Sequence, residues 1–481
     1  MHDDKSPCAA EDSWASRVIW LLVFLLTVYS VWAWAGLRPS LHQYTFYASF
    51  ALGALLVLVG PGSVRLAIFR DPVFWLGLLF NAYLVLQWSN AGRELYLDSA
   101  LNEWRYSDPP RPGWPFAFDA DEAWQMITWF VPAWLLVTAV RSPHFNAASG
   151  RRLLVGLVIS AGLLGFFGLI QYFSGTDKVF WITPFSAGFY ASFAYRNHAG
   201  SFFVMMSLVG AALLFRYVFF AEGKRVWPVV IPLLLSIGLC LVSLIFCGSR
   251  AAVFFFGISS AIIMVTGLVL SWRRGTRVQR LHTVAIIIMA VCLVIPVVRS
   301  YGLEVIRREF APKKTATTSE APIDNSDKKI SLNMSPELRV MLAKSAWGMW
   351  KDHMWYGVGG WGFKYKAAYY TPADKWNELR KGGRANVHLD ALQFLAEFGL
   401  AGFIPLLLLI FILSAAAWRK TSYDQRVLAR LVIIGLALVV VHSVIDLPFR
   451  SPGITYHWLI LFALIPNFSA NHILTRNTDK T

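Results

Sequence analysis

Residues 384–402 read R-A-N-V-H-L-D-A-L-Q-F-L-A-E-F-G-L-A-G and lead directly into a long apolar segment. Apolar side chains recur at helical spacing through this stretch, whereas Asp390 and Glu397 fall on another face. The pattern predicts a short amphipathic helix at a membrane surface that continues into a spanning helix. Gly399 and Gly402 would allow close backbone contact at the junction.

The whole chain is too apolar for a water-soluble domain. Its 481 residues are 56% hydrophobic, with a mean hydropathy of +0.51. We therefore expect an all-α polytopic membrane protein with about 12 transmembrane helices. The twelve apolar segments are 17–36, 44–60, 73–90, 123–140, 153–173, 199–220, 227–247, 251–271, 281–298, 399–417, 430–446 and 454–467.

Charge and cysteine usage agree with this class. Lysine and arginine concentrate in alternate short loops, so the positive-inside rule predicts a multi-pass protein with both termini in the cytoplasm. The net charge of +16 then reflects topology and anionic lipid headgroups, and no nucleic-acid partner is expected. The four cysteines fall in the N-terminal tail or in apolar segments, so no disulfide framework is expected.

Three parts follow in chain order. We expect membrane helices 1 to 9 in residues 1–298, a large extramembrane loop with short helices in residues 299–398, and the last three membrane helices with a tail in residues 399–481. Within the loop, Ser335 followed by Pro and Glu predicts the start of a helix, because serine caps helices and proline suits the first turn.

His388 stands at the entrance to the predicted spanning helix. A lone histidine there is more often an interfacial residue with a satisfied hydrogen bond than a functional group. Here, however, the histidine, one further residue, a spacer of nine residues and G-x-x-G at Gly399 and Gly402 follow one another. This arrangement resembles the signature of the O-antigen ligase and polymerase family, membrane glycosyltransferases that act on polyprenyl-diphosphate-linked glycans. The family usually has a polar residue where this chain has Leu389.

Two arginines extend the resemblance. Ser249 and Arg250 begin a membrane helix after a very short turn, and the family has a Ser-Arg pair there whose arginine is functionally implicated. Arg339 precedes a tryptophan-containing helix and the turn G-V-G-G-W-G-F at residues 357–363, which also matches the family. The resemblance implies a GT-C-like fold with the large loop and the active site in the periplasm, and an inverting reaction.

Arginine and histidine suit that chemistry. Guanidinium groups are permanently charged and fork-shaped, so Arg250 and Arg339 could bind a diphosphate and stabilise its departure without a metal or another cofactor. His388 could accept the proton of an acceptor hydroxyl near neutral pH. We predict these three residues to be catalytic.

Further candidates are ambiguous. Arg196, at the start of a membrane helix, could bind phosphate or anchor the helix in the headgroups. Trp361 could stack on a sugar ring or belong to an interfacial aromatic belt. Arg384 and Asp390, on either side of His388, are also predicted to bind substrate.

Five further charged residues are interpreted as structural. Asp119, Asp121 and Glu122 form a D-x-D-E pattern that favours the first turn of a helix, stabilised by the helix dipole; a divalent metal site is the alternative. Asp446 and Arg450, near the C-terminus, also resemble the family and are interpreted as supporting residues.

The sequence thus predicts an O-antigen ligase-like glycosyltransferase in a bacterial inner membrane. It would transfer a glycan from a polyprenyl (undecaprenyl) diphosphate donor to a hydroxyl of a glycolipid or glycan acceptor, such as lipid A-core. A repeat-unit polymerase of the same family is the alternative. A non-enzymatic transporter of lipid-linked sugars is disfavoured, because the charged residues of the spans lie near their ends.

Overall fold

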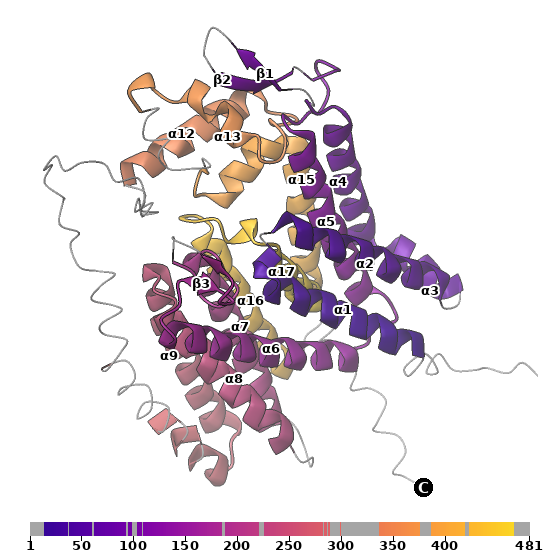
Figure 1. Cartoon of the computed structure of the whole chain (residues 1–481). Coiled ribbons are helices and arrows are strands. Elements are labelled where there is room, and N and C mark those ends of the chain that lie inside the picture. Colours follow the sequence, from indigo (N-terminus) through magenta and orange to yellow (C-terminus); the bar gives the residue numbers. More distant parts are fainter. Residues whose placement is uncertain are drawn as a thin grey trace, which may run out of the picture. The chain divides into compact units, whose positions relative to one another are not determined.

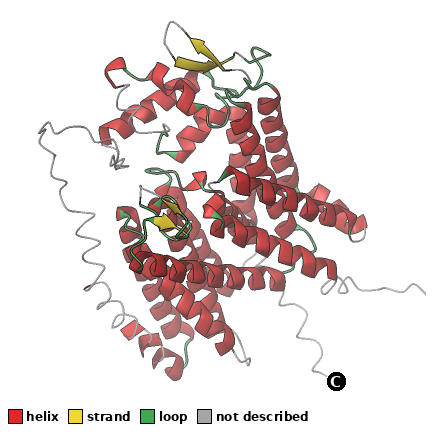
Figure 2. Cartoon of the chain, in the orientation of Figure 1, coloured by secondary structure: helices red, strands yellow, loops and turns green. Residues whose placement is uncertain are grey.

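The computed structural model of the chain describes residues 14–465 except 37, 60–61, 93–94, 99–102, 108, 185–187, 221–225, 282, 286, 289–298, 300–335, 376–385 and 419–422. This described part is mostly helical, with two small antiparallel strand pairs (Figures 1 and 2). The chain divides into two compact units. Unit 1 comprises residues 1–154, 335–429 and 443–481, and unit 2 comprises residues 155–334 and 430–442.

Unit 1 combines long helices with a set of short ones. Its elements are α1 (Trp14–Trp32), η2 (Trp34–Gly36), α2 (Pro39–Leu58), α3 (Gly62–Arg70), α4 (Pro72–Ser89), β1 (Leu95–Asp98), β2 (Glu103–Tyr106), α5 (Ala120–Arg141), α12 (Pro336–Asp352), α13 (Phe363–Lys366), η4 (Ala367–Tyr370), η5 (Ala373–Lys375), α15 (Asp390–Trp418), η6 (Pro448–Arg450) and α17 (Pro452–Leu464).

Unit 2 is built on three long helices and one short strand pair. Its elements are α7 (Arg196–Phe220), α8 (Trp227–Phe246), α9 (Arg250–Arg274), β3 (Lys178–Val179) and β4 (Thr183–Pro184). Two helices are divided between the units, α6 (Ala147–Phe173) and α16 (Tyr423–His442). Small residues allow close packing in unit 2, since a Cβ atom on Gly162 of α6 would lie 2.6 Å from the Cα atom of Ser236 in α8.

The membrane prediction is confirmed at the level of the class. Within the described residues, nine helices are long and apolar enough to cross a membrane, namely α1, α2, α4, α5, α6, α7, α8, α9 and α15. They coincide with nine of the twelve predicted segments. The segments 430–446 and 454–467 contain shorter apolar helices, and most of 281–298 lies outside the described residues. The count of twelve, the periplasmic loop and the three-part division of the chain stay predictions.

Local sequence explains where several helices begin. Asp71 caps α4 by accepting a hydrogen bond from the backbone N–H of Val73, and Pro72 occupies the first helical position. The carboxylate of Asp71 also pairs with Arg141 at the end of α5, at 2.6 Å. Helix α12 begins at Pro336, as the Ser-Pro-Glu pattern predicts. Cap and ion pair together fix the ends of α4 and α5 relative to each other.

Candidate active site

Helix α15 consists of two helical parts with a break at Gly399. The backbone of Gly399 has φ 57° and ψ −165°, a combination that essentially only glycine adopts. The residues before the break form the short helix that the sequence predicts, and the residues after it belong to the spanning part. The polar face of the short helix is the buried one, because Asp390 is 8% exposed and Glu397 is fully buried.

The glycine-rich turn fills the break in α15. A Cβ atom on Gly399 would lie 2.5 Å from the carbonyl of Trp355, so the two backbones touch. The break exposes backbone groups that would otherwise bond within the helix, and the turn and the residues just before it satisfy them. The four hydrogen bonds run from Val358 N to Ala396 O, Gly359 N to Glu397 O, Leu400 N to Met354 O and Ala401 N to Trp355 O, at 2.8 to 3.0 Å.

Ser443 to Arg450, hereafter the 443–450 segment, collects the predicted site residues of unit 1. The backbone N–H of Asp390 donates to the carbonyl of Ser443 at 2.9 Å, and its carboxylate accepts from the N–H of Phe449 at 2.9 Å. Arg339, near the start of α12, donates to the carbonyl of Ile445 at 3.0 Å. Three regions that lie far apart in the sequence therefore meet at one short segment.

His388 lies against the same segment. Its Nδ1 atom is 3.4 Å from a carboxylate oxygen of Asp446, and its side chain is 14% exposed whereas that of Asp446 is 3% exposed. The backbone φ of His388 is 55°, a left-handed conformation that costs energy for a non-glycine residue and that often marks functional sites. Asp446 is therefore the carboxylate that lies beside the His388 ring in the described part of the chain.

Arg450 and Arg339 both lie at the 443–450 segment, but only Arg450 has a carboxylate partner among the described residues. Arg450 donates to the buried carboxylate of Glu397 at 2.5 Å, and its guanidinium lies 4.3 Å from the centre of the Trp361 ring. Within the described part of the chain, Arg339 has no carboxylate partner. Glu397 neutralises Arg450, whereas no described carboxylate neutralises Arg339.

Some buried side-chain nitrogens of these residues make no hydrogen bond, as do several elsewhere in the described part of the chain. Among the described residues, the Nε atom of Arg339, the indole Nε1 of Trp361 and the Nδ1 of His388 are buried and make no hydrogen bond within the protein. Buried polar groups are normally hydrogen-bonded, so these three nitrogens are exceptions to that rule.

His353, a second histidine in the extramembrane part of unit 1, differs from His388. Burial, and secondarily the positive charge of Lys366, lowers the pKa of His353. Its backbone carbonyl accepts from Gly357 at 2.8 Å, and its ring lies against Phe116. His353 is thus part of the packing that supports the glycine-rich turn.

Unit 2 holds the other two predicted arginines. Arg196 is the first residue of α7 and Arg250 the first of α9, and a Cβ atom on Gly200 would lie 2.9 Å from the Cβ atom of Ala252, so the two helices are in contact near these starts. A Cβ atom on Gly248 would lie 3.5 Å from a guanidinium nitrogen of Arg196, which therefore lies beside the turn that leads into Arg250. Ser249 caps α9.

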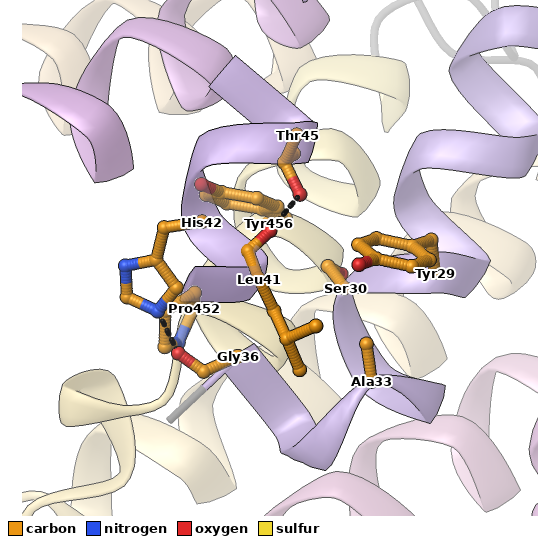
Figure 3. Close-up of a pocket in the computed structure, with 9 residues that line it drawn as sticks. All are labelled: Tyr29, Ser30, Ala33, Gly36, Leu41, His42, Thr45, Pro452 and Tyr456. Carbon is orange, nitrogen blue, oxygen red and sulfur yellow. Dashed lines mark hydrogen bonds between the residues drawn. The ribbon is translucent and has the colours of Figure 1, made fainter. Parts of the chain in front are cut away.

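The other candidate residues and the small pocket of unit 1 lie apart from this site or outside the described residues. Arg384 lies outside the described residues. Asp119 caps α5 by accepting from the N–H groups of Asp121 and Glu122, at 2.8 and 3.2 Å, as the helix-start interpretation predicts. A small pocket lined by His42, Thr45, Tyr456 and neighbours lies elsewhere in unit 1 and contains none of the predicted site residues (Figure 3).

From the sequence, Arg450 is interpreted as a supporting residue, and none of the sequence motifs assigns a role to Gln393. Gln393 is buried and its side chain contacts both Val387 and Glu397, at 3.0 Å each. A usable signal was present, because Asp390, Gln393 and Glu397 are spaced i, i+3 and i+7 and so share one helix face.

The fold and this site define a polytopic membrane protein with a histidine, carboxylate and arginine cluster at the start of a broken helix. The sequence model of the O-antigen ligase family matches residues 234–407, from α8 into α15, and this range includes Arg250, Arg339 and His388. The match confirms the resemblance to the O-antigen ligase and polymerase family. No curated protein is similar enough to the chain to count as a match.

Proposed function

We propose that the chain is a glycosyltransferase of the ligase type, which moves a glycan from a polyprenyl (undecaprenyl) diphosphate donor to the hydroxyl of a glycolipid or glycan acceptor such as lipid A-core. The observation that carries the proposal is the contact of His388 with Asp446 beside Arg339, whose charge no described carboxylate neutralises. A base, an acid that stabilises its protonated form and a cation for a phosphate are what this transfer requires.

The proposed reaction is a single displacement. The oxygen of the acceptor hydroxyl attacks the anomeric carbon while His388 accepts the hydroxyl proton, and Asp446 stabilises the resulting positive ring. The bond between the anomeric carbon and the phosphate oxygen breaks, and its electron pair leaves with the polyprenyl diphosphate. Because no enzyme nucleophile takes part, the configuration at the anomeric carbon inverts.

The cations act on the leaving group. Arg339 in unit 1 and Arg250 in unit 2 are proposed to bind the diphosphate, with Arg196 assisting, because negative charge grows on the phosphate oxygens as the bond breaks. Asp390 is proposed to support the site through its bonds to the 443–450 segment, and Arg384 and Trp361 to contact the substrate. We propose a step without metal or other cofactor, with the carboxylates of Asp119 and Glu122 occupied by cap and side-chain contacts.

Sidedness follows from charge. We propose that both termini lie in the cytoplasm and the site on the periplasmic face of a bacterial inner membrane, because basic residues favour the cytoplasmic loops. Donor and acceptor are then both membrane lipids or lipid-linked glycans that reach the site from the outer leaflet.

The test is the surface glycan profile of a deletion strain complemented with the wild type, with His388→Ala, or with His353→Gln as a matched histidine control. Full-length glycan accumulating on the polyprenyl carrier with His388→Ala supports a ligase, whereas accumulating single repeats would identify the polymerase. Normal acceptor-linked glycan with His388→Ala would refute the proposal. Transfer by the purified, reconstituted protein excludes the transporter.

A further inference from the structure

The buried polar face of the first part of α15 contains two residues that the proposed function does not use. Gln393 is 1% exposed and Glu397 is fully buried. A buried glutamine and a buried glutamate on consecutive turns are costly unless their polar atoms are bonded. Their hydrogen bonds connect Arg450, through Glu397 and Gln393, to the residues just before His388.

Gln393 contacts the residues just before His388. Its side-chain oxygen accepts from the backbone N–H of Val387 at 3.0 Å, and its side-chain nitrogen donates to the Oδ1 atom of Asn386 at 3.1 Å. The left-handed backbone of His388 has to be held by its surroundings, since a free chain would leave it. Gln393 supplies two such bonds from a rigid helix.

Glu397 fixes the orientation of Gln393. One carboxylate oxygen of Glu397 accepts from the side-chain nitrogen of Gln393 at 3.0 Å, so the oxygen of the amide is turned toward Val387. The other carboxylate oxygen pairs with Arg450 at 2.5 Å, and Arg450 in turn lies on the ring of Trp361. The hydrogen bond from Gln393 to the Glu397 carboxylate is stronger than one to a neutral acceptor, so it holds the amide orientation more firmly.

We propose that Arg450, Glu397 and Gln393 form a positioning relay that holds the His388 turn in its reactive geometry. The relay rests on the proposed function, in which His388 is the base. It assigns Arg450 to the framework and not to the diphosphate, because its charge is cancelled by Glu397. Gln393 is the member of the relay that meets the His388 turn and therefore the one to test.

The first test is kinetic and uses the purified, reconstituted full chain. Gln393→Ala is expected to lower kcat by about 10- to 100-fold with the donor KM within about twofold, since only the geometry of the base changes. Added to His388→Ala, the same change should lower the residual rate no further. Losses that multiply in the double variant would overturn the relay, because a merely structural glutamine acts whether or not His388 is present.

The second test needs no transfer activity. The rate at which diethyl pyrocarbonate modifies His388, measured on its peptide by mass spectrometry, should rise several-fold in Gln393→Ala and in Glu397→Gln. Gln171→Ala, which removes an equally buried glutamine at 2% exposure from α6, should leave the rate unchanged. An unchanged rate in Gln393→Ala refutes the relay. If His388→Ala kept full transfer while this rate still rose, the proposed function would fail and the positioning would stand.

Discussion

Two helix starts in unit 1 look alike in sequence and differ in structure. Before α5 and in its first turn stand Asp119, Asp121 and Glu122; at α15 stand His388 and Asp390, with Asp446 folded against them. At α5 two of the three acids are bonded: Asp119 caps the helix, Glu122 pairs with Lys364, and the hydroxyl of Tyr365 donates to Asp119 and to Glu122. Just before α15 the backbone of His388 is left-handed, and its Nδ1 atom lies beside Asp446 at 3.4 Å without a hydrogen bond.

The difference shows that a count of acidic residues does not make a site. Asp119 caps α5, and Glu122 pairs with Lys364 of α13. These contacts stabilise the fold and join α13 to α5. His388 is held in place by its neighbours, and its ring Nδ1 makes no hydrogen bond in the described part of the chain. Variants at the two helix starts should therefore affect different quantities.

The largest effect is expected at His388. His388→Ala should lower kcat by about 10²- to 10⁴-fold, the range typical for loss of a general base, with membrane protein levels near wild type. The measurement is transfer by reconstituted protein with purified lipid-linked donor. His353→Gln is the control, and an equal loss in that variant would show that the effect is structural.

Arg339 should come next. Arg339→Ala is expected to lower kcat/KM for the donor by about 10²- to 10³-fold, because a cation that no described carboxylate neutralises no longer meets the diphosphate. Arg339→Lys should recover only part of this loss, since an ammonium lacks the forked geometry. Unchanged activity in Arg339→Ala would remove it from the site and leave Arg196 as the better partner for Arg250.

The sequence predicted the class of fold because twenty-residue apolar runs have few other interpretations. It also predicted a short helix that leads into a spanning one, with close backbone contact at Gly399, and the helix start at Pro336, although not the break at Gly399. It favoured a helix start over a metal site at Asp119, Asp121 and Glu122, and α5 begins there, with Asp119 as its cap. These features depend on residues close together in the chain.

The sequence could not predict which distant residues meet. The bonds from Arg339 to Ile445 and from Arg450 to Glu397 span 106 and 53 residues, and no local pattern encodes them. The strand pair β1 and β2 was also missed, because the Pro-rich loop around it hides two four-residue strands. The joint site for the arginines of both units stays a prediction from motif and topology.

A moderate effect on stability is expected at Glu397. Glu397→Gln leaves Arg450 without its carboxylate, and breaking a buried pair from one side costs about 3 to 5 kcal/mol, less here because Arg450 is 12% exposed. The apparent melting temperature in detergent should fall accordingly. The double variant Glu397→Gln with Arg450→Gln should recover part of the lost stability. No recovery would mean that Glu397 stabilises the protein through other contacts.

The smallest effect is expected at the start of α5. Variants there test whether its acidic residues stabilise the fold or hold a metal. Asp119→Ala should lower stability by about 1 kcal/mol, the cost of a lost helix cap, with transfer within about twofold of wild type. Treatment with EDTA should leave transfer unchanged, because Asp119 and Glu122 are occupied by cap and side-chain contacts. If EDTA abolished transfer, a divalent ion restored it and Asp119→Ala behaved like EDTA, the α5 start would be a metal site after all. The proposed metal-free mechanism would then be wrong.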